Sequence, residues 1–197
     1  MIAQLRELAL LDTTAVVFMA DHGEGFGEHG YIHHSRSVYS DLVDIPLVIR
    51  FPARVASGRS DRLTQHVDLA PTILDLVGIG APPGFEGTSL LAEPDADRAV
   101  FVEHLRGGGA WGARQRAVVH GRHKLVRDLD TGRLELFDIA SDPHDQHDLL
   151  PDADAKLVQD LTTRLEVHAA RATGPRAPRV PLPDETRDAL EALGYLR

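Results

Sequence analysis

The sequence lacks cysteine altogether, which excludes disulfide bonds and cysteine-ligated zinc. It also lacks any apolar run of about 18 residues, so we expect no membrane-spanning segment. The formal net charge is −9 and no basic stripe offsets it, so nucleic acid is not an expected partner. The motifs H-E-x-x-H, G-x-x-x-x-G-K-[ST] and G-x-S-x-G are absent, and the sites that they mark are therefore not expected.

The N-terminal part of the chain has the features of a layered α/β domain. Hydrophobic residues make up 43 % of the sequence, enough for a core. The apolar runs at 15–19 and 45–52 predict strands, and we expect the first to be buried and parallel to its neighbours. Residues 2–9 and 35–43 have the features of helices, and residues 67–79 have those of a strand end that runs into a helix. Alternation of helix and strand is typical of a layered α/β arrangement.

The pattern changes after a connection rich in Pro, Gly and Asp. Four short strands separated by turn residues predict an antiparallel meander, and a helical pattern follows it at 152–172. These strands are expected at 99–104, 114–121, 123–129 and 133–139. Four prolines at 173–183 predict an extended linker, with a short terminal helix after it. We therefore divide the chain into an α/β part at 1–96, an antiparallel-sheet subdomain with a helix at 97–172, and a linker with a terminal helix at 173–197.

The stretch MADHGEGFGEHG, residues 19–30, concentrates metal-binding and acid–base side chains directly after the first strand. Asp21 and His22 come at the carboxyl end of that strand, where α/β sheets usually bind ligands. A carboxylate beside an imidazole suits a divalent cation. Glycines at 23, 25, 27 and 30 allow close approach to a ligand or a positive φ. Further imidazoles, which could bind an oxyanion or transfer a proton, are His29, His33 and His34.

Motifs in the same order resemble the second half of a sulfatase of the alkaline phosphatase superfamily. They are TTAVVFMADHGEGFGEHG, HHSRSVYSDLVDIPLVIRFP, HVDLAPTILDLVGI and FEGTSLL. The similarity continues through GRHKLVRDLDTGRLELFDIASDPHDQHDLL and ends with LEALGYL near the C-terminus. The resemblance implies the C-terminal part of an alkaline-phosphatase-like layered α/β domain at 1–96, followed by a small antiparallel sheet with C-terminal helices.

The resemblance also implies roles for the residues of the glycine-rich stretch. Asp21 and His22 would be two ligands of a divalent metal, most often Ca²⁺. His34, four residues after Gly30, takes the place where family members carry Lys or His, and it would bind the sulfate ester and assist departure of the leaving-group oxygen. The spacing alone does not exclude His33. Because adjacent side chains of an extended chain point apart, we expect only one of the two histidines to face Asp21 and His22.

Other residues within the matched motifs have less specific interpretations. Lys124 lies where many family members have a lysine, and it is either an ordinary strand residue, which we favour, or a substrate-binding residue. We expect His29 to support the loop, and Tyr39 and Pro46 to be structural. The segment DPHDQHD, residues 142–148, could mimic a metal cluster, although a solvated turn is the better interpretation.

The family's nucleophile has no counterpart in this sequence. It is a formylglycine made from Cys or Ser in a C/S-x-P-x-R motif of the N-terminal half, and that motif is absent here. We therefore expect a fragment that is inactive by itself and whose sheet has exposed edges that invite pairing. The implied parent is a sulfuric ester hydrolase acting on a sulfated small molecule or glycan. The alternatives are a phosphonate or phosphate ester hydrolase of the same superfamily and a non-catalytic remnant or binding module.

Overall fold

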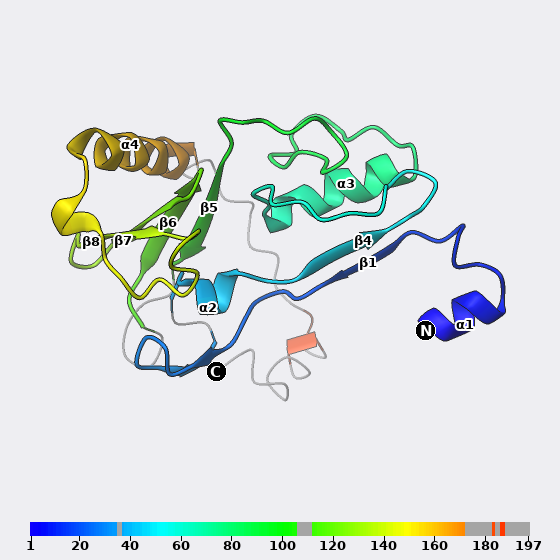
Figure 1. The fold of residues 1–197 in the computed structure, drawn as a ribbon, viewed down its shortest axis with the longest axis horizontal. Coiled ribbons are helices and arrows are strands. Elements are labelled where there is room, and N and C mark those ends of the chain that lie inside the picture. The colour runs from blue at the N-terminus through cyan, green and yellow to red at the C-terminus, as the bar shows by residue number, and fades with distance from the viewer. Residues whose placement is uncertain (35–36, 106–111, 172–182, 184–185, 188–197) are drawn as a thin grey trace.

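The computed structural model describes residues 1–34, 37–105, 112–171, 183 and 186–187. Its elements form two regions, which lie side by side in Figure 1. One is a two-stranded ribbon with the helix α3 (Leu69–Leu76) beside it, and the other is a four-stranded sheet covered by the long helix α4 (Ala155–Arg171). The predicted linker and terminal helix at 173–197 lie almost entirely outside the described residues.

The ribbon consists of β1 (Val16–Met19) and β4 (Leu47–Arg50), which pair antiparallel along their whole length. The prediction of a buried, parallel first strand is wrong, because Phe18 is 62 % exposed and the neighbouring strand runs the other way. The chain between the strands reverses through a loop and the short helix α2 (Ser40–Val43). The same connection contains the small antiparallel hairpin of β2 (Gly25–Phe26) and β3 (Ile32–His33).

The helices of the N-terminal region agree with the sequence pattern to different degrees. α1 (Ile2–Glu7) forms where a helix was expected, but none of its residues is buried. α3 follows the 3₁₀ turn η1 (His66–Asp68), and the chain leaves it at Gly78 with a φ of +77°. The helix expected at 35–43 forms only over α2; residues 35–36 lie outside the described residues.

The predicted meander is confirmed. Its strands pair antiparallel in the order β5-β6-β7-β8, and they are β5 (Ala99–His104), β6 (Gln115–His120), β7 (His123–Asp128) and β8 (Leu134–Asp138). The turn between the last two strands contains Gly132, whose φ of +78° suits the glycine. A second 3₁₀ turn, η3 (Leu150–Asp152), leads into α4.

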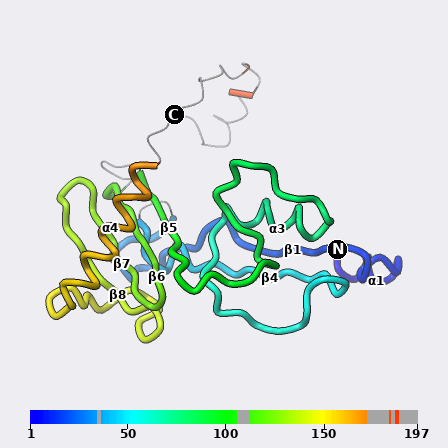
Figure 2. The backbone as a smooth tube through the Cα atoms, turned by 90° about the horizontal axis from the view of Figure 1, so that it is seen from above, coloured from blue at the N-terminus to red at the C-terminus, as the bar shows by residue number. Residues whose placement is uncertain are grey.

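Alternating side chains of this sheet form two separate cores. On one face, Val118, Leu125 and Leu136 pack against Leu161 and Leu165 of α4. Figure 2 shows α4 lying across this sheet, at the far end of the molecule from α1. None of the helices in the described part of the chain has the length and apolarity needed to cross a bilayer.

The second core joins the sheet to the N-terminal region. Ala117, Val126 and Phe137 pack there with Val38, which precedes α2 and is fully buried. The segment around Val38, which follows the glycine-rich loop, is therefore fixed against the meander.

Candidate functional site

Asp21 and His22 follow β1 directly, and their side chains approach each other beyond the end of the strand. Asp21 Oδ1 accepts the backbone N–H of His22 at 3.0 Å and lies 3.8 Å from His22 Nε2. The other ring nitrogen, Nδ1, lies 2.8 Å from the carbonyl oxygen of Gly23. Because a carbonyl only accepts, Nδ1 carries the proton of the neutral ring and Nε2 keeps its lone pair. The pair thus offers one carboxylate oxygen and one imidazole nitrogen to a cation.

His34 lies against His22, with the two rings stacked at a centroid distance of 4.5 Å. The carboxylate of Glu24 is 3.2 Å from His34 Nδ1 and 3.9 Å from His33 Nδ1. The backbone at His33 is not extended as predicted, because its φ is +80°, and both imidazoles lie near the Glu24 carboxylate. His34 is the histidine that contacts His22. The side chain of His33 is 77 % exposed, and its contact within this cluster is with the Glu24 carboxylate.

Two close contacts attach the glycine-rich loop to α2. Gly23 donates its N–H to the Leu42 carbonyl at 2.8 Å, and a Cβ at Gly23 would lie 2.0 Å from the carbonyl oxygen of Asp41. A side chain at position 23 would therefore require the backbone to shift. Further along, the Tyr31 hydroxyl lies 2.8 and 3.0 Å from the two carboxylate oxygens of Asp41. Burial raises the pKa of Tyr31 and Asp41 adds to the shift, so the phenol remains a donor.

Lys124 is buried in β7, with 1 % of its side chain exposed, and its ammonium pairs with Asp145. Nζ lies 2.6 Å from Asp145 Oδ2 and 3.2 Å from Ser40 Oγ, and the same carboxylate oxygen accepts the Ser40 N–H at 2.8 Å. Burial lowers the pKa of Lys124, and the Asp145 carboxylate opposes that shift. The ammonium therefore links the sheet to α2, which favours the structural interpretation of Lys124 over the substrate-binding one.

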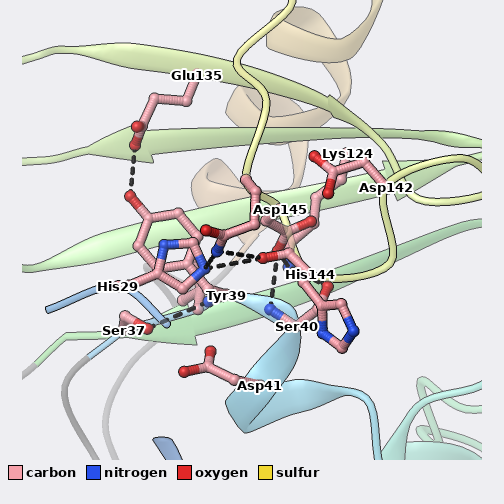
Figure 3. Close-up of polar contacts among 12 residues, drawn as sticks. His29, Ser37, Tyr39, Ser40, Asp41, Lys124, Glu135, Asp142, His144 and Asp145 are labelled. Atoms are coloured by element: carbon pink, nitrogen blue, oxygen red, sulfur yellow. Dashed lines mark hydrogen bonds and ion pairs between the residues drawn. The ribbon is translucent and has the colours of Figure 1, made fainter. Parts of the chain in front are cut away.

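The segment 142–148, expected to be a solvated turn, packs against the glycine-rich loop (Figure 3). His29 Nε2–H donates to the carbonyl oxygen of His144 at 3.0 Å, and Gln146 Nε2 donates to the carbonyl oxygen of Glu28 at 3.3 Å. The His29 ring also stacks on Tyr39, with centroids 3.9 Å apart and planes inclined by 8°. The expectation that His29 supports the loop is confirmed by these contacts.

The roles of Ser40, Asp145 and Gln146 were missed in the sequence. Ser40 lies 84 positions from Lys124, and Gln146 lies 118 positions from Glu28, so local spacing could not relate them. The one local signal is the residue type at 145: Asp tolerates the left-handed backbone that this turn adopts there, with a φ of +53°.

A cavity of about 1200 Å³ opens beside the Asp21–His22 pair. Leu47, Gln65 and Arg98 form part of its wall, and its volume is sufficient for a sugar-sized ligand. In residues 1–171, apart from the gaps at 35–36 and 106–111, no group of three or more His, Asp or Glu could hold a metal ion. The donor types of Asp21 and His22 suit a divalent cation, but a complete shell would need further ligands from another segment.

Comparison with known proteins identifies the family. Residues 27–171 match the family described as N-sulphoglucosamine sulphohydrolase, C-terminal. The chain is 35 % identical to the uncharacterized sulfatase YidJ of Escherichia coli strain K12 over 72 % of this chain and 29 % of that protein. It is 27 % identical to the N-acetylglucosamine-6-O-sulfatase of Bacteroides thetaiotaomicron over 82 % of this chain and 31 % of that protein. The chain belongs to the sulfatase family.

Solved structures show the same fold. The structure of BT4656 in complex with its substrate D-glucosamine-2-N,6-O-disulfate matches with a TM-score of 0.75 and 25 % identity, over 90 % of this chain and 39 % of that one. The phosphonate monoester hydrolase of Silicibacter pomeroyi matches with a TM-score of 0.65 and 28 % identity, over 87 % of this chain and 37 % of that one. The predicted alkaline-phosphatase-like α/β fold is confirmed. The chain spans about three tenths of the length of the YidJ sulfatase and of the N-acetylglucosamine-6-O-sulfatase.

Proposed function

We propose that this chain supplies part of the active site of a sulfuric ester hydrolase, which cleaves a sulfate ester with the help of a divalent metal ion. The observation that carries the proposal is the cluster of Asp21, His22 and His34 beyond the end of β1, in a chain of the sulfatase family. The bound substrate of BT4656 is a sulfated glucosamine, which supports a sulfated sugar or glycan as the substrate class.

Each side chain of the cluster has a defined task in this proposal. Asp21 and His22 would hold the cation, Ca²⁺ by resemblance, which would offset the negative charge of the sulfate oxygens. Protonated His34 binds a sulfate oxygen and gives its proton to the leaving-group oxygen as the S–O bond breaks. Glu24, 3.2 Å from His34 Nδ1, holds that nitrogen, so Nε2 is the nitrogen available to the substrate.

The nucleophile of this proposal is not among the residues of the chain. With no cysteine and no C/S-x-P-x-R motif in the sequence, the formylglycine would belong to a separate segment that completes the fold. We expect the chain alone to show no turnover of an aryl sulfate, because positioning and charge do not replace the covalent step. Adding a segment whose C/S-x-P-x-R motif has already been converted to formylglycine should restore turnover.

The measurement is aryl sulfate hydrolysis by the purified chain, with and without the complementing segment. The matched control is the same segment with its Cys or Ser replaced by Ala, which should restore nothing. Turnover by the chain alone that disappears in His34→Ala would overturn the requirement for an external nucleophile.

A phosphonate or phosphate ester hydrolase is the second candidate. The observation that favours it is the structural similarity to a phosphonate monoester hydrolase, whose TM-score of 0.65 is only moderately lower than that of BT4656. The complemented enzyme separates the candidates when it is offered an aryl sulfate and a phosphonate monoester at equal concentration. Hydrolysis of neither substrate would favour the non-catalytic binding module.

Metal binding by the Asp21–His22 pair can be tested without catalysis. We expect Mn²⁺, a paramagnetic probe, to broaden the imidazole NMR signals of His22. The dissociation constant should be on the order of 10⁻³ M, because Asp21 and His22 are the two ligands that this proposal takes from the described residues. Asp21→Ala should weaken this effect by about tenfold or more.

A second Asp–His pair in the chain provides the matched control for the metal experiment. Asp142 Oδ2 lies 3.7 Å from His147 Nδ1, nearly the distance found between Asp21 and His22, but the sequence assigns no metal to this pair. His147→Ala should leave the broadening at His22 unchanged. Equal broadening at both pairs would mean that Mn²⁺ binds exposed Asp–His pairs without preference.

The ribbon offers a surface for pairing with another polypeptide. Within the residues that the structure describes, β1 and β4 form a sheet of two strands, so each has one unpaired edge. Phe18 and Val48 lie opposite each other with exposed side chains. We expect the isolated chain to self-associate with concentration in sedimentation velocity, and Val48→Lys to suppress this. Val77→Lys, at an equally exposed valine after α3, is the control and should have little effect.

A further inference from the structure

We propose that His29 is a positioning residue, which holds the tip of the glycine-rich loop so that His34 stays stacked on His22. This role rests on the proposed function, in which His22 and His34 belong to the active site. His29 itself contacts Tyr39 and the 142–148 turn.

The tip of the glycine-rich loop, residues 27–30, is not held by the contacts at the ends of the loop. The contacts of Gly23 and Tyr31 with α2 hold only the two ends of the hairpin β2 (Gly25–Phe26) and β3 (Ile32–His33). Between the strands, Gly27 and Gly30 adopt φ values of +115° and +75°, and a Cβ at either position would meet no atom within 4 Å. Two local hydrogen bonds close this turn, from the Gly30 N–H to the Gly27 carbonyl at 3.1 Å and from the Phe26 N–H to Glu28 Oε2 at 2.6 Å, but neither attaches it to the rest of the protein. Contacts from outside the loop must therefore fix its position.

His29 provides those contacts with one face and with the edge of its ring. Tyr39, on which it stacks, is fixed in turn: its hydroxyl donates to Glu135 Oε2 at 2.6 Å, and its ring meets the edge of Phe137. At the ring edge, Nε2–H donates to the His144 carbonyl. The anchor of the loop is therefore the C-terminal sheet, more than a hundred positions away in sequence.

The turn that receives His29 is itself held rigidly. The Lys124 ammonium binds Asp145 in the middle of the turn at 2.6 Å. Gln146 then donates to the carbonyls of both His144 and Glu28, at 3.1 and 3.3 Å, and so joins the turn to the loop a second time. A stacked ring can slide in its own plane, whereas the directional bond to His144 cannot follow such a slide. The hydrogen bond is therefore the contact that fixes the position of the tip.

The proposal is tested on the full chain by NMR of the His22 and His34 imidazoles, without metal. His29→Phe keeps the ring on Tyr39 and removes the N–H donor, and Gln146→Ala removes the second link from the other side. We expect both variants to shift the signals of His22 and His34, and to increase the exchange rate of the Gly30 amide about fivefold, the effect of losing one typical hydrogen bond. The amide signals of Leu125 and Leu136 in the sheet core should not move.

His147→Ala is the matched control, since His147 lies in the same turn with an exposed side chain, and it should shift neither imidazole. The proposal would be overturned if the His22 and His34 signals stayed unchanged in both His29→Phe and Gln146→Ala. If His29→Phe does not fold, Gln146→Ala alone decides the test. Failure of Mn²⁺ to bind would contradict the metal role of Asp21 and His22 but not this one, because the rings are observed without metal.

Discussion

Lys124→Met should lower the free energy of unfolding by about 3–5 kcal/mol, because it leaves the Asp145 carboxylate buried without its cation. The Asp145 side chain is fully buried, and its Oδ2 receives both Lys124 and Ser40. Its other oxygen, Oδ1, is buried without a hydrogen-bond partner in the described part of the chain. Such a carboxylate depends strongly on one neighbouring charge. The measurement is urea unfolding followed by circular dichroism.

The control for this prediction removes both charges. Lys124→Met combined with Asp145→Asn leaves no buried ion, so the double variant should recover most of the loss. Asn tolerates the left-handed backbone at position 145, where φ is +53°, so the second change adds little strain. A single Lys124→Met variant as stable as the parent would show that the ion pair contributes nothing net. That result would also favour the interpretation of Lys124 as a substrate-binding residue.

The meander was predictable because its signals are local. Each strand has its own apolar run, and turn residues such as those at 130–132 lie between consecutive strands that pair with each other. The direction of β1 was not predictable in the same way. Its partner, β4, lies about thirty positions further on, and an apolar β-branched run looks the same in a parallel and an antiparallel pair. Strand existence therefore follows from the sequence more readily than strand pairing.

The residues of the candidate site also differ in how far their positions could be predicted from the sequence. Asp21 and His22 are adjacent, so their proximity beyond the strand follows from the chain itself. The family resemblance selected His34 over His33, but the backbone between them includes a positive φ at His33, which is uncommon for a residue other than glycine and which no periodicity reveals. The support from the 142–148 turn is less predictable still, because it consists of bonds between segments more than a hundred positions apart.

In an enzyme reassembled with the segment that carries the nucleophile, His34→Ala should lower kcat by about 10²–10⁴-fold, the usual contribution of a general acid. The structure supports His34 for this task because its ring contacts His22, and because Glu24 holds Nδ1 and leaves Nε2 to the substrate. A lysine can also donate a proton, and the family resemblance places Lys or His here, so His34→Lys should retain more activity than His34→Ala.

His33→Ala is the matched control for that experiment, since His33 is adjacent and reaches the same Glu24 carboxylate, but at 3.9 Å. It should change kcat by less than about threefold, because its exposed ring lacks the contact with His22 that defines the cluster. The side chain of His33 is largely exposed and that of His34 is half-exposed, so we expect little change in the unfolding midpoint from either substitution. An unchanged midpoint would allow a loss of activity to be assigned to chemistry. A larger effect at His33 than at His34 would place the general acid one residue earlier, and the stack on His22 would then be a packing contact without a catalytic role.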